Sequence, residues 1–318
     1  VFRIRQDVSR DGDGKGWSGP YKVRAEGITA RELGKGDGVL TADAISLDGR
    51  VDGVALERFA RINRMIAAQS GDGTPPSRAA RGELADLIRD GGLGRLRYGL
   101  ELDNLKLRAR GRDTALDHLK WRMELDTRDR PGKAGITLDL AGLGLPRNLG
   151  METDVPQGLI PETLKFKTTA LNLPVARLAA RALKQASAGD GPTMKAAEAR
   201  RLLAEAGLSL RLDRLALTSA LSELSVSGNL DYAADSKRDF VGSFHGEITG
   251  LQKALKALQE AGTKKAQQAA MALTMVKGFG KAGGKDTYVY DIKVPGEGPV
   301  TVNGQPLGGM NGNGGTVN

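Results

Sequence analysis

Residues that could do chemistry are few in this chain of 318 residues, and their spacing does not assemble a reaction. The chain has no cysteine, which excludes thiolate nucleophiles, cysteine metal sites and disulfides. It has two histidines, His118 and His245, and nothing in their spacing places carboxylates beside both, as a two-histidine metal site would need. We therefore predict no catalytic residues, no metal and no cofactor.

Three aspartates recur within one repeated motif. The form Leu-x-Leu-Asp-x-Leu-x-Leu occurs at residues 100–107 and 210–217, and a variant of it occurs at 136–145. The aspartates Asp103, Asp139 and Asp213 stand where the alternation of leucines slips by one residue. Because they repeat with this pattern, we interpret them as structural carboxylates that bond backbone amides at β-bulges, not as catalytic groups.

The alternating leucines predict strands, although leucine and alanine favour helices. Alternation with period two places one apolar row on one face of a sheet, and a bulge must absorb each slip to keep that row on the same face. We therefore predict long, bulged, leucine-rich strands. Their candidate hydrophobic-face residues are Leu100, Leu102, Leu105, Leu107, Ile136, Leu138, Leu143 and Leu145.

The whole pattern predicts an α+β fold in which an elongated, strongly twisted, mostly antiparallel sheet has about five helices packed against it. We expect an N-terminal sheet half over residues 1–145 with a helix at 54–69, and a C-terminal half over 146–308. The second half would carry helices near 175–187, 196–207, 251–262 and 265–279, and 309–318 would be a disordered tail. Asn303-Gly304 between apolar residues predicts a tight hairpin turn.

The charge of the chain limits its partners. The net charge is +9, acidic residues are mixed among the basic ones, and aromatic residues make up only 4%. Nucleic-acid binders usually show stacking aromatics or a recognisable module, so we expect no nucleic-acid partner. An anionic membrane surface is compatible with this charge. No apolar run approaches the roughly 20 residues that span a bilayer.

Residues 208–309 resemble a known family. Strands ending in GNLDYAADSKRDFVGSFHGEITG lead into the helix LQKALKALQEAG, a second alanine-rich helix and a closing hairpin, VTVNGQPLG, and IPETLKFKTTALNLP lies upstream. This order resembles the alphaproteobacterial domain-of-unknown-function family number 2125, with the YdgA-like family of unknown function as a near alternative. More loosely, the leucine rows are similar to AsmA-like envelope proteins linked to lipid handling.

The resemblance implies that the chain is the exported part of an envelope protein, in the periplasm or cell envelope, whose N-terminal signal or anchor is missing from this chain. Two functions remain open. In the first, the leucine face is closed core and the protein is a non-enzymatic structural or protein-interaction module with envelope proteins as partners. In the second, that face binds or transports a lipid or another hydrophobic ligand.

We favour the first function on the sequence alone. Burying a leucine stabilises a fold by about 1.5–3 kcal/mol, so an ordinary core already accounts for the leucine rows. We therefore expect Leu210, Leu212, Leu215 and Leu217 to lie in a closed core. Any groove would be confined to residues 100–107 and 136–145.

Overall fold

One antiparallel sheet dominates the computed structural model, which describes residues 1–12, 14, 16–31, 38–68, 77–109, 112–128, 131–144, 156–179, 181 and 196–307. The sheet has 15 strands and does not close on itself. Its strands are β1 (Phe2–Gln6), β2 (Ser9–Arg10), β3 (Trp17–Arg31), β4 (Val39–Val54), β5 (Arg95–Ala109), β6 (Arg112–Asp126), β7 (Gly132–Gly144), β8 (Thr163–Leu173), β9 (Ser209–Thr218), β10 (Glu223–Tyr232), β11 (Phe240–Thr249), β12 (Lys281–Gly284), β13 (Thr287–Val294), β14 (Thr301–Val302) and β15 (Gln305–Pro306).

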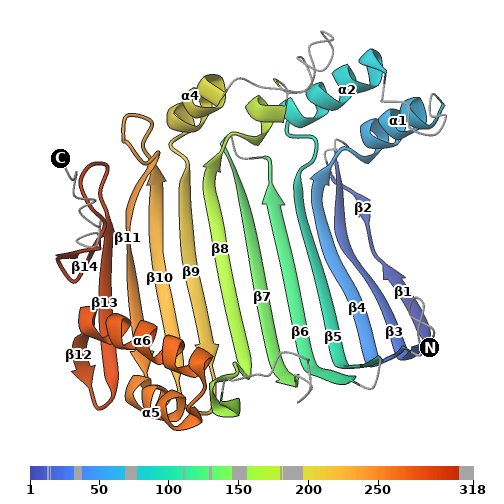
Figure 1. Ribbon diagram of the computed structural model, residues 1–318. Coiled ribbons are helices and arrows are strands. Elements are labelled where there is room, and N and C mark those ends of the chain that lie inside the picture. The colour runs from blue at the N-terminus through green and yellow to red at the C-terminus, as the bar shows by residue number, and fades with distance from the viewer. Residues whose placement is uncertain are drawn as a thin grey trace, which may run out of the picture.

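Apart from the short strands β2 and β12, the strands lie side by side in chain order, as the colour gradient in Figure 1 shows. The expected boundary near residue 145 falls between β7 and β8, which are themselves paired, so the two predicted halves belong to one sheet. The predicted tight turn is confirmed. Val302 pairs with Gln305, and Asn303 and Gly304 both have positive φ, at 52° and 85°.

The helices gather at the ends of the strands instead of lying across the sheet. They are α1 (Leu56–Ala67), α2 (Arg78–Arg89), the short 3-10 helix η1 (Gln157–Leu159), α4 (Ala196–Ala206), α5 (Leu251–Ala261) and α6 (Lys264–Phe279). Figure 1 shows α1, α2 and α4 at one end of the strands, and α5 and α6 at the opposite end over β10–β13. An antiparallel pair is joined at one end and needs no crossover, so helices inserted in such connections stay at that end.

Four of the helices expected from the sequence are confirmed as α1, α4, α5 and α6, within a few residues at each end. Of the helix expected at 175–187, residues 175–179 and 181 are helical, and its remainder lies outside the described residues. The expected tail at 309–318 also lies outside the described residues.

Helix α2 is an element that we did not predict from the sequence. Its start is marked by Ser77, whose hydroxyl accepts a hydrogen bond of 3.2 Å from the amide of Ala80. Serine is a preferred N-cap because it satisfies one of the unpaired amides of the first turn. Leu87 of α2 and Ile62 of α1 are 0% and 1% exposed. The two helices are held by a small core of their own.

A second small core lies at the other end of the sheet. Leu251 and Leu258 of α5 are 1% and 2% exposed, and Ala266 of α6 is fully buried in one cluster with Leu255 and Leu258. Leu159 of η1 packs against this cluster. The most deeply buried apolar side chains therefore belong to helices at the strand ends.

The slip in the leucine alternation has a shared structural counterpart in β3–β7. One row across these five strands is left out of the strand pairing. It contains Gly27, Asp43, Asn104, Asp117 and Gly142. Three of these residues have positive φ, namely Gly27 (63°), Asn104 (49°) and Gly142 (67°). Glycine and asparagine tolerate the left-handed backbone best. Pairing resumes in the same register on the far side, because all five strands have one residue in this row.

The three motif aspartates lie in different settings. Asp213 is at a register shift in β9, and its carboxylate accepts a hydrogen bond of 2.8 Å from the hydroxyl of the buried Thr169. Asp103 precedes Asn104 and lies 3.0 Å from the Nδ1 atom of His118. Asp139 pairs in regular register, and the slip in β7 falls instead on Gly142. The bonds at Asp103 and Asp213 join side chains, whereas we had expected backbone amides.

Candidate functional site

Apolar side chains line up across the sheet in rows, because directly paired residues of neighbouring strands point to the same face. Two adjacent rows on one face are apolar over eleven strands, and we call them together the apolar face. The first row is Ile4, Val23, Leu47, Leu100, Trp121, Leu138, Phe166, Leu215, Val226, Gly246 and Tyr290. The second row is Phe2, Ala25, Ile45, Leu102, Leu119, Leu140, Leu164, Leu217, Leu224, Ile248 and Tyr288.

The apolar face is an elongated band. Neighbouring strands are about 4.8 Å apart, so rows that cross ten strand spacings are roughly 50 Å long, and the two rows are about 7 Å apart. The band runs across the strands, from β1 to β13.

Most side chains of the apolar face are only partly buried. Leu47 is 48% exposed and Ile4 is 66% exposed, while Leu100, Leu138 and Leu215 are half-buried. In these two rows, the buried residues are Gly246 and Tyr290, near the helices α5 and α6. Neighbouring side chains shield one another within the plane of the sheet, and in Figure 1 no helix of the described residues crosses β3–β8.

Our expectation that Leu215 lies in a closed core is wrong. Leu215 occupies the same row as Leu100 and Leu138 and, like them, is only partly buried. Leu210, Leu212 and Leu217 are partly buried as well. The face is therefore partly exposed on both sides of the boundary that we had drawn between core and groove.

The predicted hydrophobic-face residues fall into three groups. Leu100, Leu102 and Leu138 belong to the apolar face, and Ile136 lies in a third row beside it, between Met123 and Thr168. Leu105, Leu107 and Leu143 lie beyond the row of positive φ, toward the other end of β5 and β7. Leu145 lies outside the described residues.

The aromatic members of the apolar face were not among the residues that we predicted for it. Trp121 and Phe166 stand in segments that alternate apolar and polar residues, as at Leu119, Trp121 and Met123, so the signal was present but was not used. Each is directly paired with Leu138, from the two sides of β7. Pairing the strands in chain order, as hairpins, would have placed both residues in the row.

The opposite face of the sheet is polar. Between the two apolar rows, the intervening residues are Arg3, Arg24, Ser46, Glu101, Lys120, Asp139, Lys165, Ala216, Ser225, Glu247 and Val289. Most of them are charged or hydroxylated, as is usual for a solvated sheet face. The sheet is thus amphipathic along nearly its full width.

On this polar face, Glu101, Asp103 and His118 come close enough to be considered as metal ligands, with one candidate ligand atom from each within 4.8 Å of the others. We had not expected carboxylates beside a histidine. The Nδ1 atom of His118 faces Asp103 at 3.0 Å, whereas its Nε2 atom faces Glu101 at 3.9 Å. Lys120 also lies 3.7 Å from Glu101. The imidazole therefore lies between two carboxylates, and its shortest contact is the one to Asp103.

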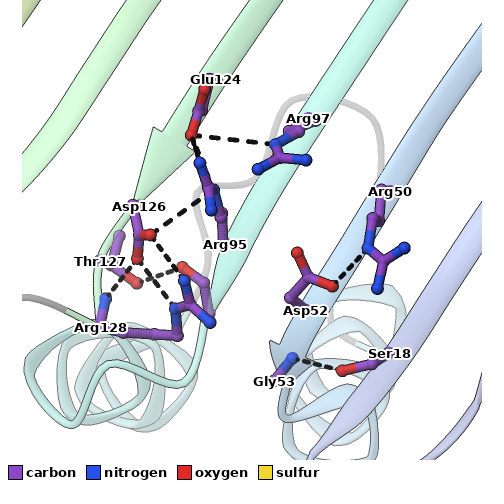
Figure 2. A network of polar contacts seen from close by, with 11 residues as sticks. Ser18, Arg50, Asp52, Gly53, Arg95, Arg97, Glu124, Asp126, Thr127 and Arg128 are labelled. Atoms are coloured by element: carbon purple, nitrogen blue, oxygen red, sulfur yellow. Dashed lines mark hydrogen bonds and ion pairs between the residues drawn. The ribbon is translucent and has the colours of Figure 1, made fainter.

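Carboxylates and arginines hold together the ends of β5 and β6 (Figure 2). Asp126 is buried, with its side chain 8% exposed, and accepts hydrogen bonds from the amide and guanidinium of Arg128. Those bonds hold the pKa of Asp126 below its usual value, and the bond from the guanidinium has the largest effect. Arg95 bonds to Glu124, and the Thr127 hydroxyl donates to the carbonyl of Gly94 at 3.0 Å. The arrangement anchors strand ends, and its charged groups are engaged with one another.

Besides a cavity of about 460 Å³ at the ends of β4–β7, lined in part by Val39, Leu107 and Gly144, two larger cavities lie away from the two apolar rows. One, of about 610 Å³, is bordered by the end of β8 and by α4, and its lining arginines Arg177, Arg181 and Arg201 are paired with Glu198 or Glu205. The other, of about 520 Å³, is lined mostly by residues of the polar face, many of them charged. Because the arginines of the first are already neutralised, it is a weaker anion site than its composition suggests.

Among known protein families, one has a model that matches most of this chain. It is described as an uncharacterized protein conserved in bacteria, DUF2125, and it matches residues 37–310. The chain belongs to the DUF2125 family. The match extends our resemblance, which rested on residues 208–309, across β4–β7 and hence across most of the apolar face. No curated protein and no solved structure matches the chain.

Helices that could cross a membrane are absent from the described parts of the chain. Within those parts, no helix combines the length and the apolar character that a bilayer span needs.

Proposed function

We propose that this member of DUF2125 is a non-enzymatic protein that binds the hydrocarbon chains of a lipid, or a similar elongated apolar ligand, along the apolar face. The observation that carries the proposal is the continuity of the two rows over eleven strands, combined with the partial exposure of their side chains. Monomeric soluble proteins rarely expose contiguous apolar patches larger than a few hundred Å². A surface of this kind gains free energy when an apolar ligand replaces the water on it.

This proposal reverses the preference that we drew from the sequence. A closed core would need a layer over the rows, and the helices of the described residues lie at the strand ends. The cores of those helices are deeply buried, at 0–2% exposure for Ile62, Leu87, Leu251 and Leu258. The contrast between these residues and the half-buried rows supports a binding surface.

The chain offers an internal reporter for a test. Its two tryptophans are Trp121, within the first row, and Trp17, at the start of β3. The indole of Trp17 donates a hydrogen bond of 2.9 Å to Glu57 of α1. A Trp17→Phe variant has Trp121 as its only tryptophan. Titration with a fatty acid brominated along its chain should quench this fluorescence in a saturable way, because bromine quenches indole at short range. The Trp121→Phe variant, which keeps Trp17, should show little quenching.

Two further variants give matched controls in the Trp17→Phe background. Leu138→Glu puts a charge beside Trp121 on the apolar face and should weaken quenching by the fatty acid. Thr137→Glu puts the same charge on the neighbouring residue, which points to the polar face between Arg122 and Lys167, and should leave the titration unchanged. Equal quenching of Trp17 and Trp121, or equal loss in both glutamate variants, would refute hydrocarbon binding on this face.

Strand pairing with an envelope protein is a second candidate function. All five residues of β1 are exposed, and in the described residues its outer edge pairs with no strand. Such an edge can accept a strand from a partner. A photo-crosslinker at residue 4 should then give a protein adduct in cells, and a crosslinker at exposed Lys106 should not. Identical adduct patterns at the two positions would count against strand addition.

The proposed location is the periplasm or cell envelope. The absence of cysteine and the basic charge support it, since an oxidising compartment makes a spare thiol hazardous and envelopes present anionic surfaces. Fractionation of cells that express the full-length protein, followed by protease treatment of spheroplasts, tests the location. Protection from protease in intact spheroplasts would contradict it.

A further inference from the structure

The helical hairpin of α5 and α6 carries a second apolar surface, separate from the apolar face of the sheet. Met271, Met275 and Val276 of α6 are 66%, 56% and 37% exposed. The buried side of α6 is made by Ala266 and Ala270, and the partly buried Ala269 and Leu273 also pack against this core. Two methionines and a valine nevertheless point to solvent elsewhere on α6, where a surface helix usually carries polar side chains.

The same hairpin is strongly basic. Residues 251–279 contain five lysines and one glutamate, and so carry +4 of the net charge of +9 of the whole chain. Four of the five lysines have exposed side chains: Lys253, Lys256, Lys264 and Lys265. Lys277 lies over the ring of Tyr288, 5.7 Å from its centroid.

Charge and apolar character follow one another along α6. Lys264, Gln268, Met271 and Met275 are spaced by four, three and four residues, so they lie on one side of the helix. Lys265 and Val276 lie on the adjacent strip. One exposed side of α6 therefore begins with lysines and ends with methionines and a valine.

We propose that the α5–α6 hairpin docks the protein onto an anionic lipid bilayer. The lysines contact lipid phosphates while Met271, Met275 and Val276 enter the boundary between headgroups and acyl chains, as an interfacial helix does. The hairpin lies over the ends of β10–β13 (Figure 1), where the apolar face of the sheet ends. Docking there brings that end of the face to the bilayer. The proposal concerns a different surface from hydrocarbon binding and does not depend on it.

Flotation of the full chain with vesicles tests the docking. Binding to vesicles of phosphatidylcholine mixed with phosphatidylglycerol should exceed binding to phosphatidylcholine alone, and salt should weaken it. A Lys264→Gln, Lys265→Gln variant should lose about 30-fold in partitioning, since each lysine near an anionic surface contributes about fivefold. A matched Lys165→Gln, Lys167→Gln variant removes the same charge from exposed positions of β8 and should bind like the unmodified chain.

The apolar contribution has its own pair of variants. Met271→Gln with Met275→Gln changes no charge and should cost at least about tenfold in partitioning, because both side chains lose burial in the bilayer. Phe59→Gln, at a 40% exposed position of α1, is the control and should bind normally. Thermal unfolding checks that each variant is folded. Absence of binding to the mixed vesicles, equal loss in test and control pairs, or capture of an acidic protein by the hairpin without vesicle binding would overturn the proposal.

Discussion

Replacing Leu215 by glutamate separates an open apolar face from a closed core. Leu215 is half-buried in the first row of the apolar face, so it contributes roughly 1 kcal/mol, about half of the 1.5–3 kcal/mol of a fully buried leucine. A glutamate on an open face can turn its carboxylate to water. We therefore expect Leu215→Glu to fold, with a loss of about 1–2 kcal/mol in the free energy of unfolding.

Leu258→Glu is the matched comparison, because Leu258 is 2% exposed in the core of α5 and α6. There the substitution removes a packed side chain, at about 2–5 kcal/mol, and buries a carboxylate without a partner, at several more. Helical circular dichroism should fall for this variant and stay unchanged for Leu215→Glu. Urea unfolding gives the two free energies. Failure of Leu215→Glu to fold, or equal losses in the two variants, would refute an open face at β9.

Three further predictions concern the polar face and the strand slips. Asp213→Ala should lower the free energy of unfolding in urea by about 1 kcal/mol or more, because the buried hydroxyl of Thr169 loses its acceptor; an unchanged midpoint would contradict this. Gly142→Ala should cost more than about 1 kcal/mol, since its φ is 67° and the added Cβ would overlap the carboxylate of Asp117. Adding Asp117→Ala should recover part of that loss, and a double-mutant cycle in urea with no coupling would rule the contact out. The pKa of Asp126 in the folded protein is lowered chiefly by the hydrogen bond from the guanidinium of Arg128. The contribution of this carboxylate to the free energy of unfolding is therefore complete above its unfolded-state pKa of about 3.9, and it is lost as the pH falls through the lower pKa of the folded state. Asp126→Asn should therefore flatten the loss of stability in acid below about pH 4, and an unaltered acid limb in pH-dependent urea unfolding would contradict the assignment.

Periodicity alone predicted the sheet and much of its amphipathic character. Alternation in segments such as 100–107 and 287–294 depends only on the pleat of a strand, which is a local property. The hairpin at Asn303-Gly304 is local as well, because both residues adopt positive φ readily. The start of α2 also obeys a local rule that could have predicted it, since Ser77 is a preferred N-cap residue and its hydroxyl serves the first turn.

What the sequence could not settle depends on contacts between distant residues. Whether a leucine row is core or open surface is decided by what lies above it, and the position of the helices at the strand ends follows from the connections of the whole sheet. Both Leu215 and Leu258 lie on apolar sides of their predicted elements, yet the first is half-buried on the sheet and the second is buried between helices. The approach of Glu101 and Asp103 to His118 likewise follows from the register of β5 with β6. The sequence by itself determined a long antiparallel sheet with one apolar side, because the alternation of apolar and polar residues can be seen within each strand. Only the tertiary structure decided that no helix of the described residues lies across this side, because cover over a sheet is supplied by elements that are remote in the chain.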